Sequence, residues 1–282
     1  MAVTTQLSNG AKRVVNRPLE TLDTLGDQMS FYIRALAWTP RAVRRYSKEI
    51  LRLLAEVSFG QGALAVIGGT VGVMIGLTMF TGVLVGLQGY AALNSIGTAA
   101  FTGFITSYFN TREIAPLVAG LALSSTVGAG FTAQLGAMRI SEEIDALEVM
   151  GVPSLPYLVT TRIIAGFIAV IPLYVIGLLA SYIASREVTV LVYGQPAGTY
   201  DHYFNLFLPP QDVFWSFLKV IIFAVVLIML HCYYGYRASG GPAGVGVAVG
   251  RAVRIAIVSI NVLDFFLSLA IWGTTTTVRI AG

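Results

Sequence analysis

The stretch VSFGQGALAVIGGTVGVMIGLTMFTGVLVGLQGYAALNSIGTAAFTGFITSYFNT, residues 57–111, holds 55 consecutive residues without a charged side chain. One membrane-crossing helix needs about 20 apolar residues. Residues 62–88 therefore predict a first crossing. Residues 91–109 are apolar but are interrupted by threonine, serine and glycine. From composition alone, this second stretch either crosses as well or forms a short re-entrant or outer-side hairpin.

The composition extends the membrane prediction to the whole chain. Of 282 residues, 56% are hydrophobic and 11% are charged, whereas a soluble domain carries about 25% charged residues. Because so few charges cannot cover a water-exposed surface, a bilayer must supply much of the solvent. Further apolar segments of crossing length are residues 114–137, 163–185, 213–236 and 255–274. We expect an all-α integral membrane protein.

A basic segment precedes this hydrophobic body. Residues 1–60 contain nine lysines and arginines and five acidic residues, which accounts for the whole net charge of +4. Thr39-Pro40 predicts a helix start, with threonine as N-cap and proline in the first turn. The helix that follows has an apolar face (Val43, Tyr46, Ile50, Leu53, Leu54, Val57) and a basic face (Arg41, Arg44, Arg45, Lys48, Arg52). Such a helix is typical of the cytoplasmic membrane interface; packing on a soluble partner is the alternative.

Several chemistries are excluded by the residues that are missing. Cys232 is the only cysteine, so no disulfide framework exists. The two histidines are distant and no HExxH motif occurs, which argues against zinc. No lysine follows a glycine, so there is no nucleotide-binding P-loop, and the basic residues carry no nucleic-acid-binding signature. We therefore expect no catalytic residue, metal or cofactor in this chain, and no cleavable signal peptide, because the first 30 residues lack an apolar run.

Glycines recur four residues apart in the first predicted crossing, at Gly68, Gly72 and Gly76 and again at Gly82 and Gly86. Small residues at this spacing make a flat helix face that allows close helix approach. The pattern fits packing within the chain and equally a dimer or substrate-facing surface. A second glycine-rich segment, residues 240–246, lacks the basic residue of a phosphate-binding loop. It predicts a flexible turn between crossings.

Ionisable residues occur inside or beside the predicted crossings. Arg112 and Glu113 follow the long uncharged run directly, and Asp264 lies within the last apolar segment. Such groups at membrane depth are energetically expensive and face protein or water. Arg112 and Glu113 could bind a polar headgroup, relay protons or neutralise each other. Asp264 requires a partner, for which a hydrogen bond to a neighbouring helix is the simplest explanation.

The segment SEEIDALEVMG, residues 141–151, predicts a short, tightly capped acidic helix between the second and third crossings. Ser141 is the expected cap, acidic residues occupy the first turn, and Gly151 with Pro153 ends the helix. The segment is too charged to enter the membrane. It is a candidate docking element for another protein, or an ordinary loop helix.

Taken together, these segments resemble the MlaE/YrbE family, the permease subunits of Mce-associated lipid ABC transporters, over about residues 45–275. The residues that carry the resemblance are 87–90 (LQGY), 112–117 (REIAPL), 136–153 (GAMRISEEIDALEVMGVP) and 263–265 (LDF). The block around residues 142–151 is the most specific. The extended basic N-terminus resembles a YrbE subunit, of the second or B type, from an actinobacterial Mce system.

The resemblance implies an interfacial helix, five transmembrane helices and a cytoplasmic coupling helix, here residues 139–152, between spans two and three. Residues 91–109 then do not cross, the N-terminus is cytoplasmic and the C-terminus is outside. Residues 1–60 form the cytoplasmic basic segment and residues 61–282 the transmembrane permease domain.

Partners are also implied by the resemblance. Two permease chains, a heterodimer in such systems, enclose a lipid-sized cavity in the plasma membrane. An ATPase dimer, which binds ATP and Mg, docks on the coupling helices, and a ring of six Mce proteins forms a hydrophobic tunnel above. The implied function is movement of lipids or fatty acids, mostly inward, with no nucleic acid involved.

The resemblance assigns roles to two sets of residues. The set for ATPase coupling is Glu142, Glu143, Ile144, Asp145, Leu147, Glu148, Met150 and Gly151, with Ile144, Leu147 and Met150 filling a groove of the ATPase. The set for the lipid cavity is Val83, Gly86, Leu87, Tyr90, Arg112, Glu113, Leu117 and Asp264, with Arg112 pairing with a headgroup carboxylate or phosphate.

A second function is a proton-coupled secondary transporter of an amphipathic substrate, with Glu113 and Asp264 as the proton carriers. Many secondary carriers contain internal repeats or a pair of matched broken helices. The sequence shows neither, which favours the ABC permease.

Overall fold

The computed structural model describes residue 23 and residues 25–59 and 69–273. Over this part of the chain the secondary structure is helical and contains no strand, as the sequence predicted. The cationic residues 12, 13 and 17, the first glycine of the Gly68 series, and the chain end beyond residue 273 lie outside the described residues.

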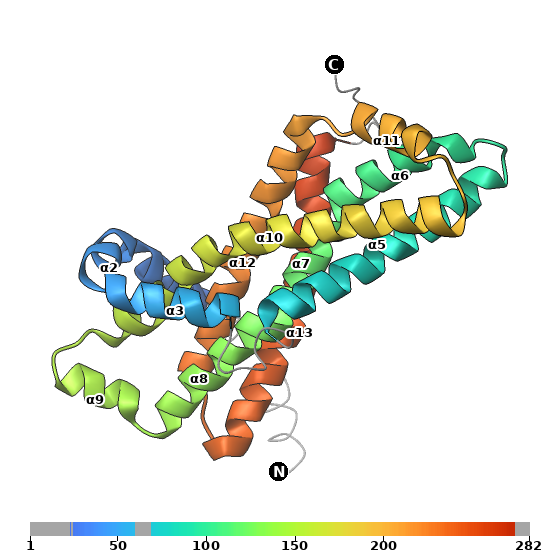
Figure 1. The fold of residues 1–282 in the computed structure, drawn as a ribbon. Helices are drawn as coiled ribbons and strands as arrows, with labels where there is room; N and C mark the ends of the chain where they lie inside the picture. Colours follow the sequence, from blue (N-terminus) through green and yellow to red (C-terminus); the bar gives the residue numbers. More distant parts are fainter. Residues whose placement is uncertain (1–22, 24, 60–68, 274–282) are drawn as a thin grey trace, which may run out of the picture.

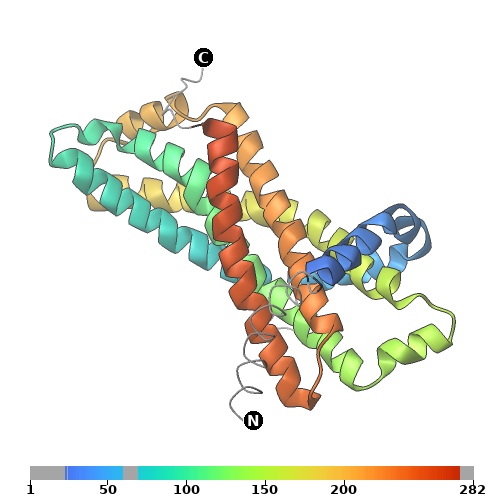
Figure 2. The same cartoon turned by 180° about the vertical axis from the view of Figure 1, so that it is seen from behind.

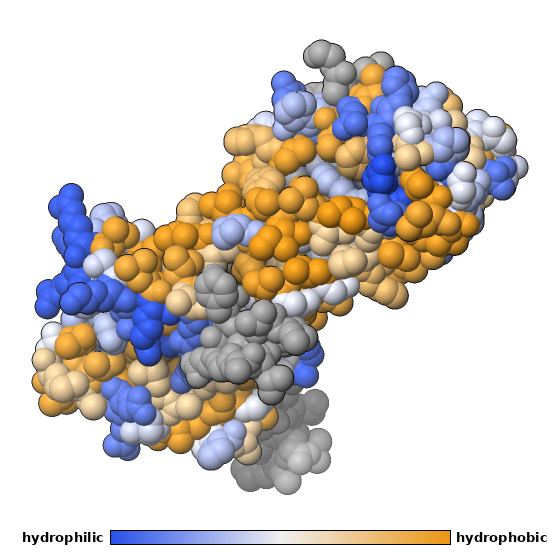
Figure 3. Space-filling view, viewed as in Figure 1, coloured by the Kyte–Doolittle hydropathy of each residue, from blue (hydrophilic) through white to orange (hydrophobic). Residues whose placement is uncertain are grey.

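Within the described residues, five helices are long and apolar enough to cross a membrane, which confirms the predicted fold class. They are Thr70–Asn94, Ala99–Ile140, Leu155–Val192, Pro210–Tyr236 and Gly241–Trp272. A space-filling view shows a hydrophobic band across the middle of the molecule, with hydrophilic side chains gathered at both ends (Figure 3). This distribution is the one that a bilayer imposes, because only apolar side chains face lipid without penalty.

The ambiguous stretch 91–109 does not form a crossing of its own. Its first residues end helix α5 (Thr70–Asn94), and a turn with Gly97 at a φ of +73° reverses the chain. The remainder forms a 3-10 turn, η1 (Ala99–Phe101), and helix α6 (Thr102–Phe109), which lies beside α5 (Figure 1). The hairpin therefore joins spans one and two.

The second long helix runs from α6 without a break in helical structure. Its successive parts are η2 (Asn110–Ile114), α7 (Ala115–Leu123), η3 (Ser124–Gly128) and α8 (Ala129–Ile140). The segments η2 and η3 are π-helical turns, and single π turns inside α-helices frequently occur at functional sites.

The third span lies along the first. It consists of η4 (Leu155–Thr160), α10 (Thr161–Glu187) and η5 (Val188–Val192), and α10 runs side by side with α5 in both views (Figures 1 and 2). A methyl group added at Gly82 would lie 2.4 Å from the Ser181 carbonyl oxygen. The spaced glycines Gly82 and Gly86 therefore serve packing within the chain.

The last two spans form an antiparallel pair that packs against α7 and α8. They are α12 (Pro210–Tyr236) and α13 (Gly241–Trp272). The sequence predicted a flexible turn over residues 240–246 and a span starting at residue 255. Both were wrong, because the turn ends at Gly240, with a φ of +89°, and Pro242 stands in the first turn of α13, where its missing N–H has no intrahelical partner to lose.

A short helix, α11 (Ala197–Leu206), covers the end of α6 and joins the third and fourth spans. Arg186 at the end of α10 donates from Nε and Nη2 to the two carboxylate oxygens of Asp201, at 2.8 and 2.9 Å. These hydrogen bonds lower the pKa of Asp201 below its usual range. The pair links α11 to the end of α10, while the buried Tyr200 of α11 packs against the bundle.

The predicted amphipathic helix is present but kinked. It divides into α2 (Thr39–Arg45) and α3 (Ser47–Phe59), with the break at Tyr46. Ile50 and Leu53 are buried against Ile164 and Ala165 of α10, so the apolar face packs within the chain. Two details were wrong: Trp38 rather than Thr39 is the N-cap, and Val43 is exposed.

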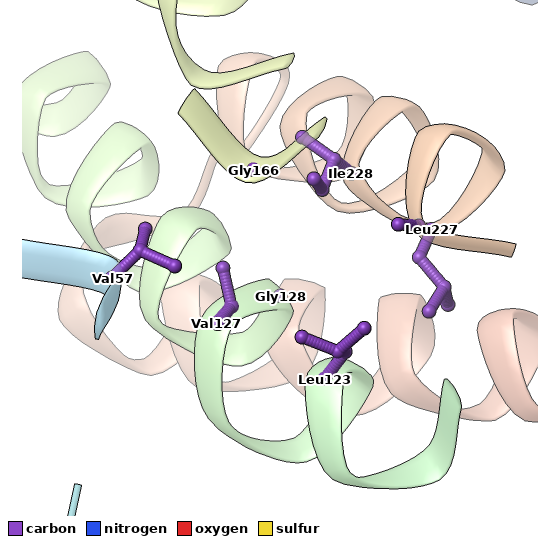
Figure 4. A pocket seen from close by; sticks show the side chains of 8 residues that line it. Val57, Leu123, Val127, Gly128, Gly166, Leu227 and Ile228 are labelled. Carbon is purple, nitrogen blue, oxygen red and sulfur yellow. The ribbon is translucent and has the colours of Figure 1, made fainter. Parts of the chain in front are cut away.

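The centre of the bundle is closely packed. Where α3, η3, α10 and α12 cross, an apolar void of about 10 Å³ remains, lined by residues that include Leu123, Val127 and Ile228 (Figure 4). Gly128 lets the buried His231 ring approach, since an added methyl group would lie 2.4 Å from its Cδ2. His231 lies between the hydroxyls of Ser124 and Thr132, at 3.1 and 2.8 Å. A void this small holds about one water molecule, so a substrate must use another surface.

Candidate functional site

A pair of oppositely charged side chains is buried where η2, α12 and α13 meet. Arg112 Nη2 lies 2.6 Å from Asp212 Oδ2, and both side chains are 4% exposed. The Trp272 indole N–H donates to the second oxygen of Asp212 at 2.9 Å. The Arg112 guanidinium also lies over the Tyr108 ring, 4.2 Å from its centroid. Every group in this pair is therefore satisfied inside the protein.

Lys219 of α12 lies beside this pair and is 0% exposed. Its ammonium group is 2.7 Å from Asp264 Oδ1 and 3.1 Å from Glu113 Oε2. It also donates to Ser268 Oγ at 2.7 Å. Asp264 thus has its partner on a neighbouring helix, and that partner is a cation.

The backbone at η2 explains one further contact of Lys219. Its Nζ donates to the Arg112 carbonyl oxygen at 2.8 Å. In a regular α-helix that carbonyl would accept from the residue four positions later, which is Pro116 and has no N–H. The lysine therefore replaces a hydrogen bond that the proline removes, and it holds the π turn and α12 together.

These five side chains, which we call the buried charge cluster, are Arg112, Glu113, Asp212, Lys219 and Asp264. Three carboxylates meet two cations, so the charges do not cancel. Glu113 is the most open member, with 37% of its side chain exposed. The excess negative charge therefore has access to the surface at Glu113.

The cluster corrects one role predicted for Arg112. A guanidinium that is buried and paired with Asp212 is not free to bind a lipid headgroup. Sequence reasoning also missed Asp212, Lys219 and Trp272 as members. A signal existed for Lys219, because it is an isolated cation inside the apolar segment 213–236, and such a residue requires a buried acidic partner.

An open apolar groove of about 480 Å³ lies between α5 and α6. One wall is a face of α5 and the other is formed by α6 and η2; the lining residues are Thr81, Leu84, Val85, Gln88, Gly89, Ala92, Ile105, Phe109 and Ile114. Ile114 belongs to η2, so the groove reaches the π turn that also carries Arg112 and Glu113.

The groove uses a different face of α5 from the one predicted to line a cavity. Gly86 is wrong as a cavity residue, because an added methyl group there would lie 2.5 Å from Val188 Cγ1. Tyr90 stacks on Tyr193, with ring centroids 4.1 Å apart, and the Leu87 carbonyl accepts from the Tyr193 hydroxyl. Val83 and Leu117 are half-buried and do not line the groove.

The acidic segment forms helix α9 (Glu143–Val149), which projects from the end of α8 (Figure 1). It is shorter than residues 139–152, because Arg139 and Ile140 belong to α8. Glu142, with a φ of +60°, stands at the N-cap, while Ser141 donates instead to the Glu143 carboxylate at 2.8 Å. Gly151, with a φ of +74°, follows the helix end as predicted.

The apolar residues of α9 divide into two groups. Ile144 is fully buried and Leu147 packs against the same core, so Ile144 is wrong as a residue that fills a partner's groove. Val149 and Met150 are 89% and 69% exposed at the tip. Val149 was missed by the sequence interpretation. The acidic residues Glu142, Glu143, Asp145 and Glu148 are also exposed, spread from the N-cap to the last turn of the same helix.

The described residues contain five membrane-length helices, ionisable groups turned inward between them and a projecting helix between spans two and three, and these features define a class: a multi-pass membrane protein. The family model named Permease MlaE matches residues 59–270. Since this match covers well over half of the chain, the protein belongs to the MlaE permease family.

Relatives with curated names agree with this assignment. A probable ABC transporter permease protein of Rickettsia bellii is 28% identical over 91% of this chain and 94% of its own length. The chloroplastic protein TRIGALACTOSYLDIACYLGLYCEROL 1 of Arabidopsis thaliana is 27% identical over 71% of this chain and 57% of its own length. A probable ABC transporter permease protein of Synechocystis is 28% identical over 67% of this chain and 72% of its own length.

Proposed function

We propose that this chain is the membrane-spanning permease subunit of a Mce-type ABC transporter, which moves lipids or fatty acids across the plasma membrane. A separate ATPase supplies the energy and holds the ATP and Mg. The observation that carries the proposal is the construction of α9, a projecting acidic helix anchored from behind by a buried side chain.

The geometry of α9 suits a docking element. Ile144 fixes the helix to the core of the permease, so a push on α9 moves the bundle and not the helix alone. Val149 and Met150 supply exposed apolar contacts, and the exposed carboxylates along the same helix supply charged ones. An apolar centre with a polar rim is the usual anatomy of a protein interface.

The α5–α6 groove suits an acyl chain. Its walls are almost wholly apolar, with Thr81 and Gln88 as the polar exceptions. The half-exposed carboxylate of Glu113, on the same π turn as the groove residue Ile114, is a candidate contact for the polar end of an amphipathic substrate. A second permease chain, in a heterodimer with this one, would close the open side, and a hexameric Mce ring would continue the path. The name of the Arabidopsis relative contains that of a glycolipid, which supports a lipid cargo.

Reconstitution tests this function directly. The chain, its partner permease and the ATPase are placed in vesicles with a fluorescent lipid, and transfer is measured with ATP. We expect transfer that needs ATP and stops when the ATPase carries a substitution that abolishes hydrolysis. Transfer driven by a proton gradient without the ATPase would instead support the secondary transporter.

A matched pair of variants tests the docking surface. Val149→Asp should release the ATPase during purification while the permease keeps its elution volume. Leu191→Asp is the control, because Leu191 is also exposed, at 73%, but lies in η5 and far along the chain from α9. Loss of the ATPase from both variants, or from neither, would contradict a docking site on α9.

A further inference from the structure

A buried histidine of the fourth span, α12, lies against the π turn η3 of the second span. His231 is fully buried, and its two ring nitrogens face hydroxyls on either side of that turn. Its Nε2 lies 3.1 Å from the Oγ of Ser124, the first residue of η3. Its Nδ1 lies 2.8 Å from the Oγ1 of Thr132, which stands one helical turn beyond the last residue of η3. A single side chain therefore bridges the π turn from end to end.

One arrangement of protons satisfies every polar group in this contact. With the ring proton on Nδ1, His231 donates to Thr132 Oγ1, and the Thr132 hydroxyl donates to the His231 carbonyl oxygen at 3.0 Å. The other ring nitrogen, Nε2, then accepts from the Ser124 hydroxyl. Because a buried polar group without a partner is costly, this contact favours one fixed position of the ring between the two spans.

The backbones of the two spans also lie close together at this level. A methyl group added at Gly128 would lie 2.4 Å from His231 Cδ2, and one added at Gly235 would lie 2.8 Å from the Thr132 carbonyl oxygen. Both distances are shorter than van der Waals contact. Glycine at these two positions therefore lets α12 lie directly on η3 and α8.

The apolar packing around the same turn is incomplete. Leu123 and Val127 line the void of about 10 Å³ together with Leu227 and Ile228 of α12 (Figure 4). Side chains that border a void have no contact atoms on that side. The hydrogen bonds of His231 are therefore the directional contacts that hold η3 and α12 in register.

We infer that His231 is a positioning residue of the transport cycle, which fastens η3 to α12 so that α12 follows when α8 and α9 move. The inference rests on the proposed function, in which a separate ATPase moves α9. Since α12 carries Asp212 and Lys219 of the buried charge cluster, the fastened helix brings the movement to that cluster by a second route beside span two. A π turn at the fastening point fits this role, because such turns are frequent at functional sites.

The ratio of lipid transferred to ATP hydrolysed tests this role. It is measured in vesicles that contain the two permease chains and the ATPase. His231→Leu keeps a buried apolar side chain but removes both hydrogen bonds of the ring. The ratio should fall about fivefold, the change in an equilibrium that the loss of one hydrogen bond produces, while ATP hydrolysis and co-purification of the ATPase persist. His231→Gln retains a hydrogen-bonding group and should recover most of the ratio.

Tyr174→Phe is the matched control. It removes a buried hydroxyl that is bonded to Ser216, and so breaks another hydrogen bond onto α12 away from η3. This variant should keep the wild-type ratio. An equal fall in Tyr174→Phe and His231→Leu would mean that any lost hydrogen bond to α12 has this effect, and would overturn the inference. An unchanged ratio in His231→Leu would overturn it as well.

If His231→Leu does not yield folded protein, Ser124→Ala/Thr132→Val removes the two hydroxyls from the other side of the contact and is judged by the same criterion. Loss of the ATPase during purification of either variant would mean that the contact supports assembly and not the transmission of movement, and would count against the inference.

A second measurement needs no transport. Melting temperatures of the purified full-length chain are compared for His231→Leu, for Ser124→Ala/Thr132→Val and for the two combined. Because both changes remove the same contact, the combined variant should melt no lower than the less stable of its parents. Additive losses would overturn the inference. If the wild-type complex transfers no lipid with ATP, the proposed function fails, and the transport role of His231 fails with it whatever the melting temperatures.

Discussion

The charged residues near the two ends of one long helix differ in burial: those at one end are enclosed and paired, and those at the other are exposed. Near the start of Ala99–Ile140, Arg112 is buried and paired, and its neighbour Glu113 contacts a lysine that is fully enclosed. Just beyond the other end, the acidic residues of Glu142–Glu148 project from the bundle. Their contacts are local: Arg139 with Asp145, Ser141 with Glu143 and Ser154 with Glu148.

The difference shows what each charge does for the protein. The buried charge cluster joins η2, α12 and α13. Removal of one partner would leave an uncompensated charge in an apolar interior. An exposed pair is screened by water and contributes little to stability. The buried charges therefore stabilise the helix bundle, and the exposed charges of residues 142–148 are available to bind a partner. Of the four predictions below, the first and the last test this contrast between charges, and the other two extend it to uncharged residues that are buried or exposed.

The largest effect is expected for Lys219→Met. The substitution leaves Glu113 and Asp264 without their cation and should reduce the free energy of unfolding by about 3–5 kcal/mol. Thermal unfolding of the detergent-solubilised protein, followed by fluorescence, measures the change. Adding Glu113→Gln and Asp264→Asn to the same chain should recover most of the loss. A melting temperature unchanged by Lys219→Met would show that the cluster is not structural.

The second-largest effect on stability is expected within α9, where buried Ile144 is compared with exposed Val149. Ile144→Ala should cost about 2–5 kcal/mol of stability, because it removes a fully buried side chain. Val149→Ala should leave stability unchanged and weaken ATPase binding by about 1 kcal/mol or more. Unfolding and pull-down measurements on the two variants separate the roles. The reverse pattern, with Val149 important for stability, would contradict the division of α9 into an anchor and a tip.

Helix contact between α5 and α10 gives an intermediate effect. Gly82→Ala places a methyl group 2.4 Å from the Ser181 carbonyl oxygen and should cost about 1–3 kcal/mol through overpacking. Gly76→Ala is the control, since a methyl group there has no neighbour within 4 Å. Equal melting temperatures for the two variants would mean that α5 does not lie against α10 at this depth.

The smallest effect is expected at the exposed end. Arg139→Gln breaks the pair with Asp145, whose side chains are 39% and 58% exposed. Stability should fall by less than about 1 kcal/mol, and the change should vanish at high salt. A loss comparable to that of Lys219→Met would remove the contrast between the two ends.

The sequence predicted the fold class because hydropathy alone determines which segments can enter a bilayer. Boundaries were less predictable. The last helix starts at Gly241, ahead of the expected residue 255, since glycines, Arg251 and Arg254 lower local hydropathy without preventing a helix that extends beyond the hydrocarbon.

The candidate site was predictable only in part. The need of Asp264 for a partner follows from its position, but the identity of that partner depends on which helices lie together, and Lys219 is 45 positions away in the chain. The π turn at η2 has no simple sequence signature. The packing role of Gly82 and Gly86 was one of two open alternatives, and only the approach of α10 decides it.

The 42-residue helix Ala99–Ile140 has a mechanical consequence. At 1.5 Å per residue, the stretch from Arg112 to Ile140 is a strut of about 42 Å. Because continuous helical structure joins the base of α9 to the buried charge cluster, a movement of α9 along the helix axis would reach the cluster, reduced by whatever the π turn η3 between them absorbs. The helix is expected to bend most easily at η3, where the backbone hydrogen-bonding pattern changes from α to π and Ser124 contacts His231. The stiffness of the α-helical parts on either side of η3 would then determine how closely the movement of Arg112 follows that of Ile140.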